Sequence, residues 1–225
     1  MVIYGKQVCI YALQKHGNLV KRVYIAKKGI LPQELFNQYK ESVTFLEEKW
    51  AQKMSKNGNH QGILLEMEDF VQTPLSKMKQ GKFLVVLDGL SDVGNIGAVV
   101  RSAYALGADG VIASRVKSLN FEGIARTSSG SLLSMPFFIH DNILDVFHEL
   151  SDVGFKLYGA SRNGEDIDTL SFSDKRVLVL GSEGDGISKR ALSKLDKIVS
   201  IQMSHEFDSL NVSAAASILI HRMGK

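Results

Sequence analysis

Three short polar segments of this chain carry the residue types that chemistry requires. The first runs from Asn95 to Arg101, the second is the glycine-rich run 181–186, and the third runs from Ser209 to Ser213. Each one follows or opens a regular element, which is where α/β proteins place their ligand sites. We therefore treat the three segments as candidate parts of one site.

The glycine-rich run reads Gly-Ser-Glu-Gly-Asp-Gly and follows an apolar strand. Glycine lets a ligand approach the backbone closely, but the spacing is not that of the dinucleotide fingerprint. The carboxylates of Glu183 and Asp185 would also repel a pyrophosphate. This composition favours a neutral or cationic ligand, with an ordinary structural turn as the alternative.

Arg101 is the cation of the first segment. If residues 95–107 form a helix, no acidic side chain stands three or four positions away from it, where a helical ion-pair partner would lie. Its guanidinium can bind phosphate or carboxylate through two parallel hydrogen bonds. Arg101 is thus a candidate anion ligand, and an ordinary surface arginine is the alternative. Asn95, Ser209 and Asn211 have a comparable alternative as helix caps.

Positive charge is concentrated at the start of the chain. The formal net charge is +3; residues 1–73 hold ten Lys and Arg against seven Asp and Glu, whereas residues 74–225 hold 17 of each. Six basic residues precede the first acidic one, Glu34. Clustered basic charge is typical of proteins that bind a phosphate backbone, although a solvated lysine face has the same composition.

The composition indicates a globular protein with ample core. At 225 residues and 44% hydrophobic content, the chain can hold two small domains or one larger one. The single cysteine, Cys9, excludes an internal disulfide framework and suits a reducing compartment. Apolar runs are too short to cross a membrane, and the first residues lack the layout of a secretory signal. We therefore expect a soluble, cytoplasmic protein.

The chain divides near residue 75 into two parts. In the first part, helices are predicted over 8–16, 47–54 and after Pro32, and strands over 19–26, 43–46 and 62–67. This alternation predicts a small α/β domain over residues 1–73. The polar stretch 74–81 is expected to be a linker.

Residues 82–225 repeat the alternation on a larger scale. Apolar strands are predicted over 83–88, 110–113, 136–139, 155–160, 177–180 and 198–202, with helices between most of them. Continuous apolar strands joined by helices indicate a parallel sheet that is covered on both faces. Ligands bind outside the carboxyl ends of such strands. There the sequence reads Asp88-Gly89, Ala160-Ser161 and Gly181-Ser182-Glu183.

The three polar segments, in this order, resemble the signature of the SpoU (TrmH) family of RNA ribose 2′-O-methyltransferases. The first motif matches at 95–103, the second at 178–186 and the third at 201–213. Near the start, the residues at 3–5 and 60–63 resemble the small substrate-binding domain of the RlmB-type branch. The resemblance covers nearly the whole chain.

The resemblance implies an α/β fold of the SPOUT type, in which a parallel sheet ends in a deep trefoil knot at the carboxyl end. Such a knot is an exception to the rule that chains do not thread loops. The domain over 82–225 would be catalytic, and the domain over 1–73 would resemble RNA-binding ribosomal proteins. The resemblance also implies S-adenosylmethionine as cofactor, structured RNA as substrate, and a homodimer. It implies no metal.

The resemblance further assigns roles to single residues. The implied catalytic set is Arg101, Asn95, Glu183, Ser209 and Asn211. The implied cofactor-binding set is Gly181, Ile201, Leu210, Met203, Leu180 and Gly130. The clustered charge and the resemblance at 60–63 together give the expected RNA-binding set, which is Lys6, Lys21, Arg22, Lys27, Lys28 and His60. A guanidinium stays protonated in proteins, so an arginine general base would require a site that strongly perturbs Arg101. We therefore favour a clamp, in which Arg101 holds the RNA phosphate and a water accepts the proton.

The sequence departs from the family pattern in two places. Val93 stands where relatives usually have proline, and Gln202 and His205 replace the common proline and glycine of the third motif. His205 is expected near the cofactor pocket, where it could alter the shape of the loop or proton transfer; sequence drift in a tolerant loop is the alternative.

We therefore expect an S-adenosylmethionine-dependent ribose 2′-O-methyltransferase that acts on a guanosine of large-subunit ribosomal RNA. Transfer RNA is the main alternative substrate. A catalytically silent RNA-binding factor for ribosome assembly is the alternative from another class, but such a factor has no chemical reason to keep all five catalytic residues. A methyltransferase of the common doubly wound type would need a glycine-rich loop after its first strand, which residues 87–92 do not supply.

Overall fold

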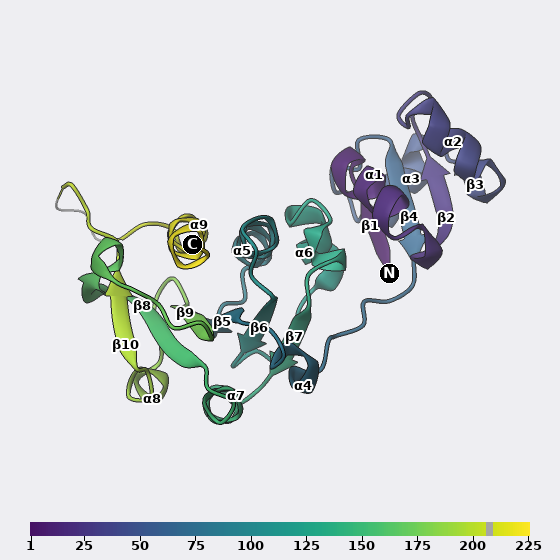
Figure 1. The fold of residues 1–225 in the computed structure, drawn as a ribbon. Helices are drawn as coiled ribbons and strands as arrows, with labels where there is room; N and C mark the ends of the chain where they lie inside the picture. The colour runs from purple at the N-terminus through teal and green to yellow at the C-terminus, as the bar shows by residue number, and fades with distance from the viewer. Residues whose placement is uncertain (206–208) are drawn as a thin grey trace. The chain divides into compact units, whose positions relative to one another are not determined.

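The computed structural model describes residues 1–205 and 209–225 (Figure 1). The chain forms two compact units, each with its own sheet. The first unit consists of 1–71 together with 120–134, and the second consists of 72–119 together with 135–225.

The first unit is built on a four-stranded sheet in the order β1-β4-β2-β3. The strands are β1 (Val2–Tyr4), β2 (Val20–Ile25), β3 (Val43–Phe45) and β4 (Ile63–Met67). Strand β4 runs antiparallel to both β1 and β2, whereas β2 and β3 are parallel. The helices are α1 (Lys6–Lys15), α2 (Gln33–Tyr39), α3 (Glu48–Met54) and α6 (Phe121–Thr127), with 3-10 turns at 17–19, 40–42 and 131–133. The start of the chain therefore contains both helices and strands around one mixed sheet.

Helix α6 joins the first unit although it is far along the chain. The backbone N–H of Val2 donates to Glu122 Oε1 at 2.7 Å, and the rings of Phe70 and Phe121 lie 4.6 Å apart. Tyr11 Oη and Ser134 Oγ are 2.7 Å apart. Residues 120–134 therefore pack with the first unit, although the sequence assigns them to the domain over 82–225. The reason is that α6 packs against β1, and the turn that follows α6 contacts α1.

The second unit is built on a six-stranded parallel sheet in the order β10-β8-β9-β5-β6-β7. The strands are β5 (Phe83–Asp88), β6 (Gly110–Ser114), β7 (Phe137–His140), β8 (Lys156–Asp166), β9 (Arg176–Gly181) and β10 (Lys197–Ser200). The helices are α4 (Leu75–Met78), α5 (Val93–Ala105), α7 (Ile143–Ser151), α8 (Lys189–Leu192) and α9 (Val212–Met223), with a 3-10 turn at 167–169. The predicted parallel α/β sheet is confirmed.

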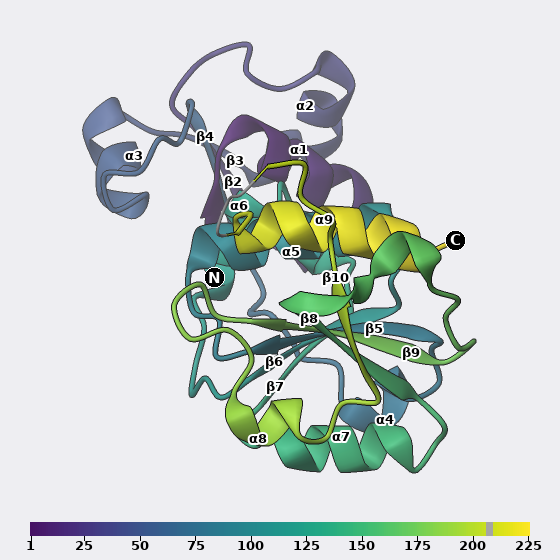
Figure 2. The ribbon, with the colours of Figure 1, turned by 90° about the vertical axis from the view of Figure 1, so that its left-hand side faces the viewer.

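Helices cover both faces of this sheet. Figure 2 shows α5 and α9 on one face and α7 and α8 on the other. Alternate side chains of β5 divide between the two faces: Leu84 and Val86 join an apolar cluster with Phe147 of α7. Residues 83–88 are all buried, as the strand at the centre of a two-sided sheet must be.

Within the described part of the chain, no helix is long and apolar enough to cross a membrane.

Several elements differ from their expected form, among them β8, which runs to Asp166 although the expected strand ends at residue 160. Strand β1 was not expected, because three residues are too few for a periodic pattern. Residues 75–78 form α4 inside the expected linker 74–81; Leu75 and Met78 are buried in the apolar cluster, so this stretch is part of the second unit. Helix α5 begins at Val93 rather than Asn95, because Asp92 caps it by accepting the N–H of Asn95 at 2.7 Å.

Candidate functional site

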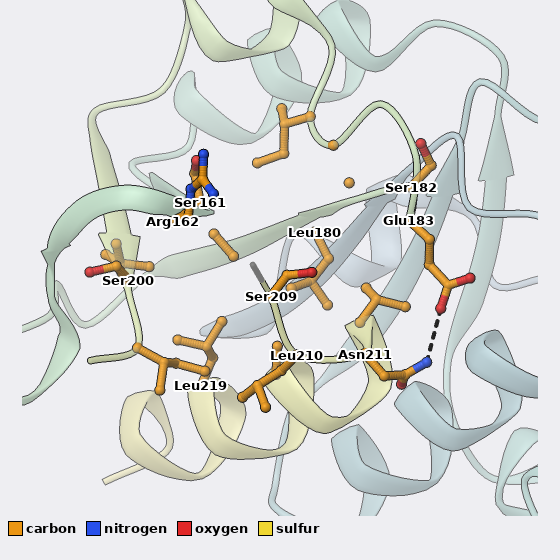
Figure 3. Close-up of a pocket in the computed structure, with 18 of the residues that line it drawn as sticks. Ser161, Arg162, Leu180, Ser182, Glu183, Ser200, Ser209, Leu210, Asn211 and Leu219 are labelled. Carbon is orange, nitrogen blue, oxygen red and sulfur yellow. Dashed lines mark hydrogen bonds between the residues drawn. The ribbon is translucent and has the colours of Figure 1, made fainter. Parts of the chain in front are cut away.

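A pocket of about 590 Å³ opens at the carboxyl ends of β8, β9 and β10, beside the start of α9 (Figure 3). Its described lining includes residues from all three strands, the loop 181–187, and the turn 209–212. The apolar part comes from Leu180, Ile201, Met203 and Leu219, among others. This is the position in which open parallel sheets bind ligands.

The glycine loop forms one wall of the pocket and is folded back on itself. Ser182 and Gly186 exchange two backbone hydrogen bonds, at 3.2 and 3.0 Å. A Cβ atom on Gly181 would lie 2.0 Å from the backbone carbon of Gly186. Residue 181 must therefore be glycine for the loop to close as it does.

A buried carboxylate fixes this loop against the central strand. Asp88, fully buried at the end of β5, accepts the backbone N–H of Ser188 at 2.7 Å. Its other oxygen lies 3.2 Å from Nη1 of Arg115. A buried charge is stable only when it is paired in this way. The chain that follows the glycine loop is thereby held at the carboxyl edge of the sheet.

Three polar side chains from the three predicted segments meet at the other wall. Asn211 Nδ2 donates to Glu183 Oε1 at 2.9 Å and to Asn95 Oδ1 at 3.0 Å. Asn95 Nδ2 donates to the same Glu183 oxygen at 3.0 Å. Figure 3 shows the contact between Glu183 and Asn211 at the edge of the pocket. The triangle joins segments that are 88 and 28 residues apart, so the expected single site is formed.

The position of Asn211 is determined by the helix that it caps. Its Oδ1 accepts the N–H of Ser213 at 2.9 Å and of Ala214 at 3.4 Å. Because the oxygen is used by the helix start, the amide nitrogen is turned toward Glu183. The cap and the candidate catalytic role therefore belong to the same side chain.

Helix α5 lies beside α9 and carries Arg101. The hydroxyls of Ser102 and Ser217 are 2.8 Å apart across the two helices. Arg101 is exposed and is not among the described residues that line the pocket. It lies six positions after Asn95, which corresponds to roughly 9 Å along the helix axis. The side chain of Arg101 is thus exposed to solvent outside the described lining of the pocket.

Comparison with known proteins identifies the family. Residues 82–221 match the SpoU rRNA Methylase family, and residues 2–71 match a domain described as RNA 2′-O ribose methyltransferase substrate binding. The chain belongs to the SpoU family. A protein of Mycobacterium avium described as an uncharacterized tRNA/rRNA methyltransferase is 32% identical over 181 residues, which is 77% of this chain and 59% of that protein. The chain thus spans less than two thirds of that relative's length.

Solved SpoU structures share the fold. The SpoU methyltransferase AviRb of Streptomyces viridochromogenes, in complex with AdoMet, superposes with a TM-score of 0.80 at 22% identity, over 100% of this chain and 89% of that one. The AdoMet-bound rRNA methyltransferase of Sinorhizobium meliloti gives a TM-score of 0.78 at 22% identity, over 99% and 85% of the two chains. At these identities the likeness establishes the fold.

The structure brings most of the SpoU motif residues to the pocket. Of the expected cofactor-binding set, Gly181, Leu180, Ile201, Met203 and Leu210 line it. Of the expected catalytic set, Glu183, Ser209 and Asn211 line it, and Asn95 is bonded to two of these. The third motif also includes residues 206–208, which lie outside the described residues.

Gly130 is not placed at this pocket. It belongs to the first unit, with φ +94°, and a Cβ atom there would lie 2.7 Å from the ring of Tyr11. Glycine is required there by the turn after α6, and the expected contact of Gly130 with the cofactor stays a prediction. His205 is exposed and does not line the described pocket either.

The expected RNA-binding residues form two groups on the sheet of the first unit. Lys6 follows β1, and Lys27 and Lys28 follow β2; these strands run in the same direction, so the three lysines share one end of the sheet. Lys21 and Arg22 lie at the other end, where a bulge in β2 leaves both exposed. All five are exposed.

His60 is not part of that surface. Its side chain is 3% exposed; Nδ1 accepts the N–H of Gly62 at 3.0 Å, and Nε2 lies 3.1 Å from Glu48 Oε1. A ring enclosed in this way shapes the turn before β4 and offers RNA no surface. The expected role of His60 in RNA binding would require this ring to become exposed, and it stays a prediction.

Several residues of the lining were not among the expected site residues, and Arg162 is the positively charged one of these. With Ala160 and Ser161 it reaches the pocket from β8, and Ser200 joins from β10. The available signal was the polar end of the expected strand 155–160. The sequence analysis singled out Ala160 and Ser161 there, but it did not extend to Arg162. No group of three metal-ligating side chains is found among the described residues.

Proposed function

We propose that this protein transfers a methyl group from S-adenosylmethionine to a ribose 2′-hydroxyl of structured RNA, most favourably a guanosine of large-subunit ribosomal RNA. The observation that carries the proposal is the joining of Asn95, Glu183 and Asn211 at the pocket edge, beside the helix that bears Arg101. The match of residues 2–71 to an RNA 2′-O ribose methyltransferase substrate-binding domain supports the chemistry.

The pocket suits the proposed cofactor in size and charge. A volume of about 590 Å³ is in the range of small-molecule sites. Two carboxylates, Glu183 and Asp185, line it, and they favour a cationic ligand. The cofactor would supply an electrophilic methyl group on a positively charged sulfur. Leu180, Gly181, Ile201 and Leu210 would hold it through backbone and apolar contacts.

The residues of this chain would then position the nucleophile. A ribose 2′-hydroxyl held at the pocket edge would be the nucleophile toward the methyl group that the cofactor supplies, and its proton would pass to water. Arg101 would hold the adjoining RNA phosphate, since guanidinium binds phosphate in a bidentate manner and keeps its proton. The Glu183–Asn211–Asn95 triangle would fix the two helix starts around the reacting group. Holding both reactants in line is itself a large part of the rate enhancement.

The first unit would supply the surface that binds the RNA backbone. Its five exposed basic residues lie at the two ends of one sheet, and Lys21 is partly compensated by Glu68 at 2.8 Å. Each phosphate contact releases counterions, so the salt dependence of binding reports how many contacts form.

Reversing two of these charges tests whether the first unit binds RNA. Lys21→Glu combined with Arg22→Glu is expected to weaken RNA binding and to lower the slope of log affinity against log salt by about 1–2. The measurement is fluorescence anisotropy with labelled RNA at several salt concentrations. Lys189→Glu with Lys194→Glu, the same charge change at exposed positions of the second unit, is the matched control. An unchanged slope in the Lys21→Glu, Arg22→Glu variant would mean that these basic residues are solvated and do not contact RNA.

We also propose the knot and the homodimer that the family resemblance implies. Arg222 of α9 donates to the carbonyls of Asp168 and Leu170, and Arg176 Nε donates to the carbonyl of Met223. These contacts support a carboxyl-terminal helix passed through the segment 166–176.

The exposed apolar side chains on the neighbouring helices α5 and α9 support the homodimer. Tyr104 and Ile218 are each 44% exposed, and a second subunit would bury that face.

The experiment that tests the function is transfer of tritiated methyl from labelled cofactor to total unmodified RNA, separated by size. The modified position is mapped by the resistance of the ribose to alkaline cleavage. Label at an alkali-resistant site of large ribosomal RNA is the expected result. Label in transfer RNA would retain the chemistry and change the substrate. Cofactor binding without label in any RNA would instead favour a silent assembly factor.

A further inference from the structure

Strand β8 leaves its ladder for five residues beside the pocket. On β10 the consecutive residues Ile198 and Val199 pair with Gly159 and Glu165 of β8. Residues 160–164 therefore stand outside this ladder, and they form an irregular bulge. Bulges redirect side chains and are common beside active sites.

The bulge is held by its own contacts. At Gly164 a Cβ atom would lie 2.5 Å from the backbone carbon of Val199, so only glycine allows the chain to return this closely. The hydroxyl of Ser200 donates to the Gly164 carbonyl at 2.9 Å. The segment that carries Ser161 and Arg162 is thus a formed structural feature of the pocket wall.

Arg162 is the one Lys, Arg or His among the described residues that line the pocket. The acidic residues of the lining, Glu183 and Asp185, come from the glycine loop. Figure 3 shows Arg162 with Ser161 on one side of the cavity and Glu183 with Asn211 on the opposite side. The pocket therefore has a positive and a negative side.

We propose that Arg162 binds the α-carboxylate of S-adenosylmethionine. The inference rests on the proposed function and adds a determinant of cofactor specificity to it. At neutral pH the cofactor carries a sulfonium, an ammonium and a single carboxylate. The carboxylate is repelled by Glu183 and Asp185 and attracted by the guanidinium across the cavity. Guanidinium and carboxylate form two parallel charge-assisted hydrogen bonds, which are stronger than neutral ones.

The test compares two ligands that differ only in this group. Decarboxylated S-adenosylmethionine keeps the sulfonium and the ammonium and lacks the carboxylate. Isothermal titration calorimetry of the full chain, without RNA, is expected to show about 10–100-fold tighter binding of the intact cofactor. This measurement requires no variant, so it does not depend on the folding of a mutant.

The variant Arg162→Gln removes the charge and keeps much of the length. It is expected to lose the preference, by binding the intact cofactor about 10–100-fold more weakly and the decarboxylated ligand unchanged. Arg162→Lys is expected to retain part of the preference. Arg190→Gln makes the same change at an exposed residue that is not in the described lining, and it is expected to keep the wild-type preference.

Two results would overturn the assignment while leaving the proposed function intact. One is equal affinity of the wild-type protein for the two ligands. The other is an equal loss for both ligands in Arg162→Gln, which would mean that the arginine only shapes the pocket. A wild-type protein that binds neither ligand would overturn the proposed function, and the role of Arg162 with it.

Discussion

Replacement of Arg101 by alanine is expected to reduce methyl transfer to RNA by at least about 10²–10³-fold, the range found when one positioning donor is removed from an active site. Cofactor affinity, measured without RNA, is expected to stay within several-fold of the wild-type value. The reason is geometric: Arg101 is exposed on α5 and is not among the described residues that line the pocket. Single-turnover transfer and calorimetry on the same preparation give the two numbers.

Arg101→Lys distinguishes the clamp from a general base. An ammonium keeps the charge but not the planar fork, so a phosphate clamp predicts partial activity with an unchanged pH profile. If the guanidinium were instead the proton acceptor, the lysine variant would shift the pH dependence of the rate, because its pKa is lower. Loss of cofactor binding in Arg101→Ala would contradict both roles and place the residue in the cofactor site.

Replacement of Gly181 by alanine is the second large expected effect. The added methyl group would meet backbone atoms of Gly186 and Ile187 at 2.0–2.4 Å, and backbone cannot rotate away as a side chain can. The loop 181–186 must then open, which removes one wall of the pocket. Cofactor affinity is expected to fall by at least about 100-fold. Overpacking of this kind costs about 1–3 kcal/mol of unfolding free energy, or roughly 3–10 °C in Tm.

Gly184→Ala is the matched control for stability. It lies in the same loop, and its added methyl meets no described atom within 4 Å. Its Tm is expected to stay within about 2 °C of the wild type, since surface substitutions rarely change stability by more than about 0.5 kcal/mol. Wild-type Tm and cofactor affinity in Gly181→Ala would show that the loop can relax, and that its closed form is not required for binding.

Several features of this protein could be predicted from the sequence because they depend on neighbours along the chain. The continuous apolar runs at 83–88 and 177–180 identify strands buried on both faces. The capping pattern at Asn211 identifies the start of the last helix. The order of three motifs indicates the SpoU family, since residue types at fixed spacing are all that such a comparison needs.

Other features depend on contacts between residues far apart, and only the tertiary structure decided them. That residue 130 must be glycine depends on its approach to Tyr11, more than a hundred residues earlier. Whether His60 is a surface ligand depends on its enclosure by Glu48 and Gly62. Burial of this kind is not encoded in the local hydrophobic period.

The pocket wall that carries Arg162 is the clearest case. A bulge in β8 is defined by its register against β10, whose paired residues lie more than thirty positions later. A local pattern predicts that residues 155–160 form a strand, but not how many residues the neighbouring strand will match. By itself, then, the sequence determined most of the helices and strands, the family and the motif residues. The strand register and the packing between distant segments decided which side chains face the cavity, because those depend on where the backbones come together in space.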